Sequence, residues 1–95
     1  MGDLILQYIW EVFQIEGRGT VVIGETAAGW ESAETGDQIV LRTPEGRSIR
    51  TVIKDKERIS KPEGPTKGVL LTDVIPSDQL PRGTQMLRVS NEHTT

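Results

Sequence analysis

The stretch that decides the fold class is Val12-Phe13-Gln14-Ile15-Glu16-Gly17-Arg18-Gly19-Thr20-Val21-Val22-Ile23-Gly24. Its first part continues Leu6–Ile15, a segment rich in β-branched and aromatic residues, and its second part, Thr20–Ile23, is an apolar run of strand length. The link at Gly17-Arg18-Gly19 is short, and its two glycines accept positive φ angles, so the segments are predicted to form a β-hairpin. Gly24 follows the second run directly, which predicts a bulge or the close approach of another backbone.

The remaining chain continues as short strand-like segments separated by turns. Gln38–Arg42 and Arg47–Ile53 flank Thr43–Gly46, where Pro presets φ and Gly accepts the left-handed region, so a second hairpin is predicted. Leu6–Ile15 also carries apolar residues at helical spacing, but its β-formers and the glycines after it favour a strand. The full expectation is strands at 6–15, 20–23, 38–42, 47–53, 68–74 and 85–89, an irregular connection at 27–35, a loop at 60–68 and one helical turn with Ser77 as its N-cap.

Six short strands with glycine-rich turns predict an all-β fold, and a closed antiparallel barrel would remove the edges of so small a sheet. Ninety-five residues predict one domain, which we place at residues 1–89 with a flexible tail at 90–95. A domain of this size has little core to spare, so an exposed apolar patch would indicate a partner or a dimer. No apolar run reaches the ~18 residues of a membrane helix and no signal peptide is recognisable, so we expect a cytoplasmic protein without membrane contact.

Residues with catalytic or metal-binding chemistry are scarce. The chain has no cysteine, and its one histidine, His93, lies in the tail. Without a second histidine or a cysteine a metal site is not expected, and a Ser-His-Asp arrangement is not credible. Acid pairs such as Glu31 and Glu34 show no sign of the burial that tunes a catalytic carboxylate. We therefore expect no enzyme, no cofactor and no metal.

Charge is distributed unevenly along the chain. Residues 1–41 hold seven acids and one base, a net of −6, whereas residues 42–67 hold eight bases and four acids, a net of +4. One interpretation of the basic stretch is a hairpin edge whose charges prevent strand addition. The other is a surface that contacts phosphates. Its candidate RNA contacts are Arg42, Arg47, Arg50, Lys54, Lys56, Arg58, Lys61 and Lys67.

Three segments together resemble the second-domain β-barrel of elongation factor Tu and related translational GTPases. Residues 12–24 are similar to the family's "VFxIxGRGTVVxG" opening, Gly36-Asp37 with Ile39 and Leu41 matches "GDxIxL", and residues 68–85 resemble its closing segment. The resemblance covers about residues 6–89 and implies the same small barrel. In that family the barrel helps to hold the acceptor end of aminoacyl-tRNA or contacts ribosomal RNA.

The chain departs from that family in ways that bear on function. No Gly-x-x-x-x-Gly-Lys-Ser/Thr loop is present, so nucleotide binding and GTP hydrolysis are not inherited. Residues 61–67 replace an acidic, glycine-containing segment, and no residue matches an aminoacyl-end pocket.

The sequence therefore predicts a non-catalytic binding module that acts through protein–protein contacts or self-association. Trp30 lies in the irregular connection between Gly24 and Gly36, and it is a candidate interface anchor, although core packing is the usual role of such a residue. The alternative is an RNA- or ribosome-associated translation module that uses the basic 42–67 hairpin. All aromatic residues lie within the first thirty positions, so the basic stretch lacks the stacking platforms typical of single-stranded nucleic-acid binding.

Overall fold

The computed structural model describes residues 4–62 and 64–89. The expected tail at 90–95 and the first three residues of the expected domain lie outside the described residues. The chain is all-β, as predicted, with six strands and two short 3₁₀ turns. The elements are β1 (Leu4–Ile15), β2 (Gly19–Thr26), η1 (Trp30–Ser32), β3 (Gln38–Arg42), β4 (Ser48–Lys61), β5 (Gly64–Leu71), η2 (Ser77–Gln79) and β6 (Thr84–Arg88).

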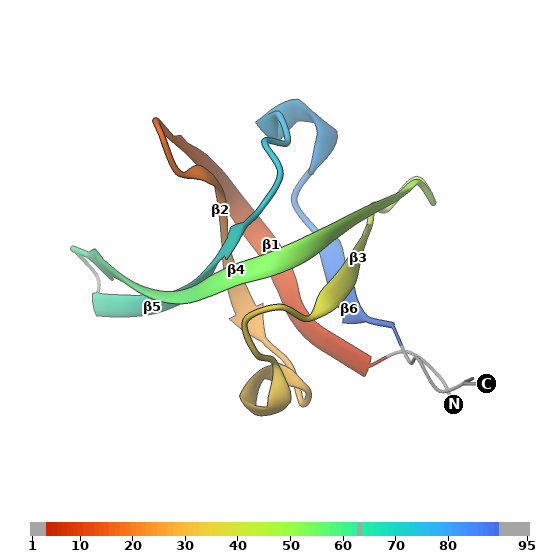
Figure 1. Cartoon of the computed structure of the whole chain (residues 1–95), viewed down its shortest axis with the longest axis horizontal. Helices are drawn as coiled ribbons and strands as arrows, with labels where there is room; N and C mark the ends of the chain where they lie inside the picture. The colour runs from red at the N-terminus through yellow and green to blue at the C-terminus, as the bar shows by residue number, and fades with distance from the viewer. Residues whose placement is uncertain (1–3, 63, 90–95) are drawn as a thin grey trace.

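The six strands close into a ring in the order β1-β2-β5-β4-β3-β6, and β6 pairs back onto β1. Every pairing is antiparallel, so the predicted closed antiparallel sheet is confirmed. In this order β1 lies opposite β4, and β2 lies opposite β3. Figure 1 shows β4 crossing in front of the receding β1.

The first hairpin forms as its glycines predict. Gly17 and Gly19 have φ angles of +80° and +127°, and Ile15 pairs with Gly19 across the turn. Gly24 pairs with Ile9 at the point where the register of β1 and β2 shifts, so Trp10 is the extra residue of a β-bulge. A Cβ atom on Gly24 would lie 2.7 Å from the carbonyl carbon of Tyr8. Both features expected at Gly24, the bulge and the close backbone approach, are confirmed.

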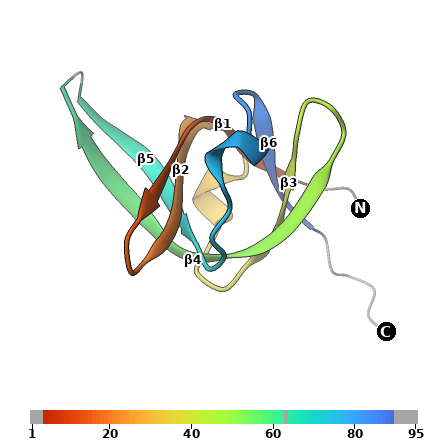
Figure 2. The same cartoon turned by 90° about the horizontal axis from the view of Figure 1, so that it is seen from above.

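The largest difference from the predicted fold concerns β4 and β5. The predicted loop at 60–68 is mostly strand: β4 continues to Lys61 and β5 begins at Gly64, although β5 ends at Leu71 rather than Val74. We call residues 58–67 the arm, because there β4 and β5 pair only with each other, beyond the ring. Pro65 has no backbone N–H to donate. It is compatible with this hairpin because the outer edge of β5 pairs with no third strand at this position. Figure 2 shows the arm projecting from the ring.

The core fills the ring and is closed at both ends by connections. It includes Ile9, Val22, Ile53, Leu71 and Met86, all at most 2 % exposed. At one end Ile75 and Leu80 of the β5–β6 connection are buried, and the Ile75 amide donates to the Thr20 hydroxyl at 2.8 Å. The predicted turn at Ser77 is present as η2, but its N-cap is Pro76 and no side chain caps it, so the Ser77 cap is wrong.

Candidate protein-binding surface

Three aromatic side chains of β1 face solvent. Tyr8, Trp10 and Phe13 are 36 %, 47 % and 42 % exposed, and we call them the aromatic surface. Tyr8 pairs with Glu25 and Phe13 with Val21, and cross-strand partners project from the same side of a sheet. These β2 residues alternate with Val22, which lies in the core, so Tyr8 and Phe13 point outward from the ring. Trp10 projects beside them because the bulge adds one residue to the strand.

A second apolar cluster lies on the outer side of the ring next to this surface. Val21, Ile23 and Leu70 are buried there, with Ile15 and Ile59 packed against them. Ile59 belongs to the arm, so the arm packs against this outer cluster through that residue while it projects from the ring. An ion pair between Arg18 and Glu57, 2.9 Å long, joins the β1–β2 turn to β4 over this region.

A cleft separates the aromatic surface from the tip of the arm. It encloses about 310 Å³ and is lined on one side by Trp10, Glu11 and Arg82, and on the other by residues 64–66. The Arg82 guanidinium lies over the Trp10 ring, 6.0 Å from its centroid. A cleft of this size, with one aromatic wall and one charged group, is large enough for a single protruding side chain of a partner.

Trp30 does not provide an exposed anchor. It is 5 % exposed and packs in the core, so the proposed interface role of Trp30 is wrong and core packing is its role. The Lys56 ammonium lies 4.7 Å from the centroid of the Trp30 ring and donates to the carbonyls of Trp30 and Ala33, each at 3.1 Å. The Trp30 carbonyl also accepts the Ala33 amide at 3.1 Å within the turn, so the Lys56 ammonium adds a second donor to it.

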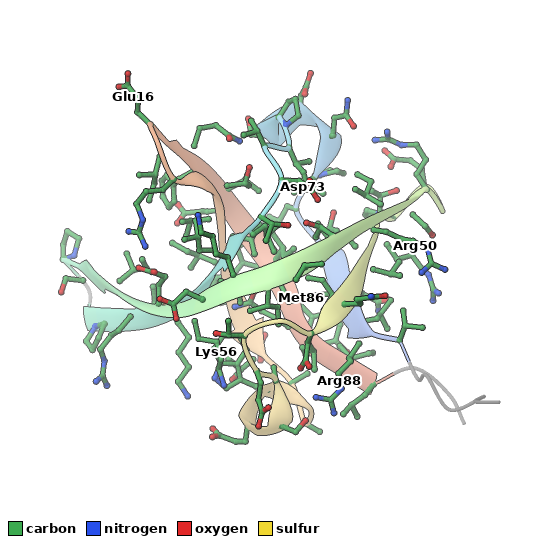
Figure 3. All side chains as sticks on the ribbon, in the orientation of Figure 1. Glu16, Arg50, Lys56, Asp73, Met86 and Arg88 are labelled. Carbon is green, nitrogen blue, oxygen red and sulfur yellow. The ribbon has the colours of Figure 1, made fainter. Side chains whose placement is uncertain are left out.

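The connection that carries Trp30 is held as a cap on the ring. Arg88 donates to the Ser32 carbonyl at 2.8 Å and pairs with Asp37 at 3.2 Å, from the side opposite Lys56. Figure 3 shows Lys56 and Arg88 reaching this connection from two directions. The connection therefore closes one end of the ring.

The structure divides the basic stretch into separate groups. Arg42, Arg47 and Arg50 lie on the β3–β4 hairpin, where Val40 pairs with Arg50 and Arg42 pairs with Ser48 on the outer side. We call these three exposed residues the arginine surface. Lys54 and Arg58 are exposed further along β4, and Lys67 lies 3.9 Å from Glu31. The Lys61 side chain lies outside the described residues, and Lys56 is committed to the cap, so it is not a free RNA contact.

The aromatic surface was not singled out by sequence reasoning, which named only Trp30 as a candidate interface anchor. The signal present was the row of large residues at Tyr8, Trp10 and Phe13 among inward residues such as Ile9 and Val12. A strict period of two places Trp10 and Phe13 on different sides of a strand. Only the bulge, which depends on pairing with β2, turns all three outward.

Among residues 4–62 and 64–89, no cluster of three metal-ligating side chains occurs. No helix in this part of the chain is long and apolar enough to cross a membrane. No protein-family model matches the chain, and no curated protein or solved structure matches it significantly.

Proposed function

We propose that this chain is a non-catalytic binding module that acts through protein–protein contacts made by the aromatic surface. The observation that supports this most directly is the exposure of three aromatic side chains on one strand of a domain whose core is otherwise closed. Aromatic residues are enriched in protein interfaces and contribute much of their binding energy. The adjoining cleft offers a place for one side chain of the partner.

Charges around the aromatic surface indicate the chemistry of that partner. Glu11, Glu16 and Glu25 are exposed on or beside the same face, and Figure 3 shows Glu16 projecting from the tip of the β1–β2 turn. Arg18 on this side is neutralised by Glu57. The surface therefore suits a protein segment that places Arg or Lys side chains around an apolar centre, because cations pair with the glutamates and stack on the rings.

Contact through the faces of strands is favoured over strand addition at an edge. Ring closure leaves β1 paired on both sides at residues 7–9 and β2 paired on both sides at residues 20–23. The arm has open edges, but it carries Arg58 and Pro65, and Lys54 precedes it on β4; these are residue types that block strand addition. A partner is thus expected to bind side chains rather than to extend the sheet.

A selection of random peptides displayed on phage, using the immobilised chain as bait, tests this function. We expect the enriched peptides to combine Arg or Lys with apolar residues. They should bind a Tyr8→Ser, Trp10→Ser, Phe13→Ser variant at least about tenfold more weakly, since aromatic truncation at an interface centre costs 2 kcal/mol or more. Val74→Ser is the control, because Val74 is a 72 % exposed apolar residue that lies beside the β1–β2 turn and is not one of the three aromatic residues. Equal binding to the triple variant and the wild type would refute the proposal.

We further propose kinship with the second-domain barrel of translational GTPases, as a cytoplasmic module without nucleotide or enzymatic activity. The support is the order of the three motifs in the sequence, together with an all-β ring of six antiparallel strands. Gly17, Gly19 and Gly24 in those motifs have fold-building roles, so the kinship concerns architecture and does not identify a ligand.

A second candidate function is RNA binding by the arginine surface. It is favoured by one observation, the gathering of Arg42, Arg47 and Arg50 on a single hairpin. If it is correct, co-sedimentation with bulk tRNA at low salt should fall steeply at moderate salt, and an Arg47→Glu, Arg50→Glu variant should lose it. A Lys54→Glu, Arg58→Glu variant changes the net charge equally and is the control. The absence of any co-sedimentation at low salt would remove this candidate.

A further inference from the structure

We propose that the partner of the aromatic surface is the arginine surface of a second copy of this chain, so that the module assembles head to tail. This inference rests on the proposed function and names its partner. Its starting point is the ring order, which places the outer face of β1 and β2 on the side opposite the outer face of β3 and β4. One molecule therefore presents the two surfaces in opposite directions, and Figure 1 shows β4 in front with β1 receding behind it.

The two surfaces complement each other in charge. Glu16 and Glu25 border the aromatic surface, and the opposite face carries Arg47 and Arg50. The same division appears in the sequence, where residues 1–41 are net −6 and residues 42–67 are net +4. Between two copies, this arrangement brings glutamates toward arginines and arginine guanidinium groups toward exposed aromatic rings.

The surfaces also complement each other in shape. Trp10, the extra residue of the β1 bulge, is 47 % exposed, lines the cleft and has the Arg82 guanidinium over its ring. A hollow of about 190 Å³ beside Arg50 is lined also by Gln38, Ile39, Thr51, Val52 and Asp73. The Asp73 carboxylate accepts the Thr51 hydroxyl at 2.7 Å, and its other lone pairs are acceptors for an indole N–H. A single Trp side chain is a suitable occupant for a hollow of this kind.

A symmetric dimer through either surface is disfavoured by charge. Two aromatic surfaces facing each other would bring Glu16 and Glu25 toward their own copies, and two arginine surfaces would do the same with Arg47 and Arg50. Like charges brought together in this way oppose association. A head-to-tail contact avoids both repulsions, and because its two surfaces differ, it produces open chains or rings rather than a closed dimer.

Sedimentation velocity of two complementary variants, alone and mixed, tests the inference. One variant, Tyr8→Ser with Trp10→Ser, lacks the aromatic surface, and the other, Arg47→Glu with Arg50→Glu, lacks the arginine surface. We expect the wild type to form larger species as concentration rises, and each variant to self-associate at least about tenfold more weakly. An equimolar mixture should give a heterodimer that grows no further, because each variant retains the surface that the other one needs. Circular dichroism confirms that both variants are folded.

The other outcomes separate this inference from the proposed function. If the arginine variant associates like the wild type while the aromatic variant does not, the head-to-tail contact is refuted and the protein-binding function stands. If the wild type remains monomeric at every concentration, self-assembly is refuted, and the peptide selection still decides the proposed function. If the aromatic variant associates like the wild type, the aromatic surface does not mediate the association. Both the proposed function and the head-to-tail contact are then refuted. A Lys54→Glu, Arg58→Glu control that dissociates as fully as the Arg47→Glu, Arg50→Glu variant would show a nonspecific charge effect and overturn the inference.

Discussion

Replacing Trp30 with alanine is expected to lower the free energy of unfolding by about 3–5 kcal/mol, the usual cost of removing a large buried aromatic side chain. Trp30 is 5 % exposed and packs against the core of the ring. Its loss would open a cavity under η1 and would also remove the aromatic face on which the Lys56 ammonium lies, 4.7 Å from the ring centroid. Small domains have total stabilities of roughly 5–15 kcal/mol, so this substitution is expected to leave the chain close to unfolding.

Trp10→Ala provides the matched control, because it removes the same side chain from a position that is 47 % exposed. Its cost is expected to be about 1 kcal/mol or less, as for most surface substitutions. Urea unfolding followed by far-ultraviolet circular dichroism measures both variants without relying on tryptophan fluorescence. If Trp10→Ala destabilises the chain as much as Trp30→Ala does, the assignment of one tryptophan to the core and the other to the binding surface is incorrect.

The contrast between the two tryptophans shows how far sequence reasoning extends in this chain. The roles of Gly17, Gly19 and Gly24 can be predicted from the sequence around them. Gly17 and Gly19 have the positive φ angles that disfavour other residues, and Gly24 lies too close to another backbone to carry a side chain. The role of Trp30 depends on Lys56, which lies 26 positions away and reaches it only after β4 has formed. No local pattern carries that information.

The arm was missed for a similar reason. Its composition of Lys, Pro, Glu and Gly is typical of a loop, and strand structure there is stabilised by pairing between β4 and β5 and by Ile59 packing on the outer cluster. The candidate site was missed in turn, because its cleft is formed by the arm and by a bulge, and both depend on pairing between strands. Composition did predict that residues 1–41 are acidic and residues 42–67 are basic. The inference that the partner is a second copy of the chain starts from this division of charge.

Replacing Gly24 with alanine is expected to cost roughly 4–5 kcal/mol or to prevent folding, which is a severe effect for a single methyl group. The new Cβ would lie 2.7 Å from the carbonyl carbon of Tyr8 and 2.8 Å from the Cα of Ile9. Both are backbone atoms of the neighbouring strand, so no side-chain rotation relieves the overlap. The strands would have to separate at the bulge, and β1 pairs with β6 as well as β2 there.

Gly17→Ala is the control, because Gly17 has a φ angle of +80° but no atom within 4 Å of a Cβ built on it. It tests the left-handed conformation without an overlap, at an expected cost of about 1–2 kcal/mol. Thermal unfolding by circular dichroism ranks the two variants. An equal or smaller effect of Gly24→Ala would mean that β1 and β2 are not as close at this bulge as the structure describes.

The Gly24 bulge also connects the fold to the proposed function. It lets β1 bend from its pairing with β2 into its pairing with β6, and it turns Trp10 outward as the extra residue. A Gly24→Ala chain that still folds must therefore shift or remove the bulge, and Trp10 would move with it. Such a chain is expected to lose binding to the selected peptides by at least about tenfold, whereas the folded Gly17→Ala chain keeps it. If a folded Gly24→Ala chain still bound the peptides, the binding surface would not depend on the bulge. The bulge would then not be the reason that Trp10 faces outward.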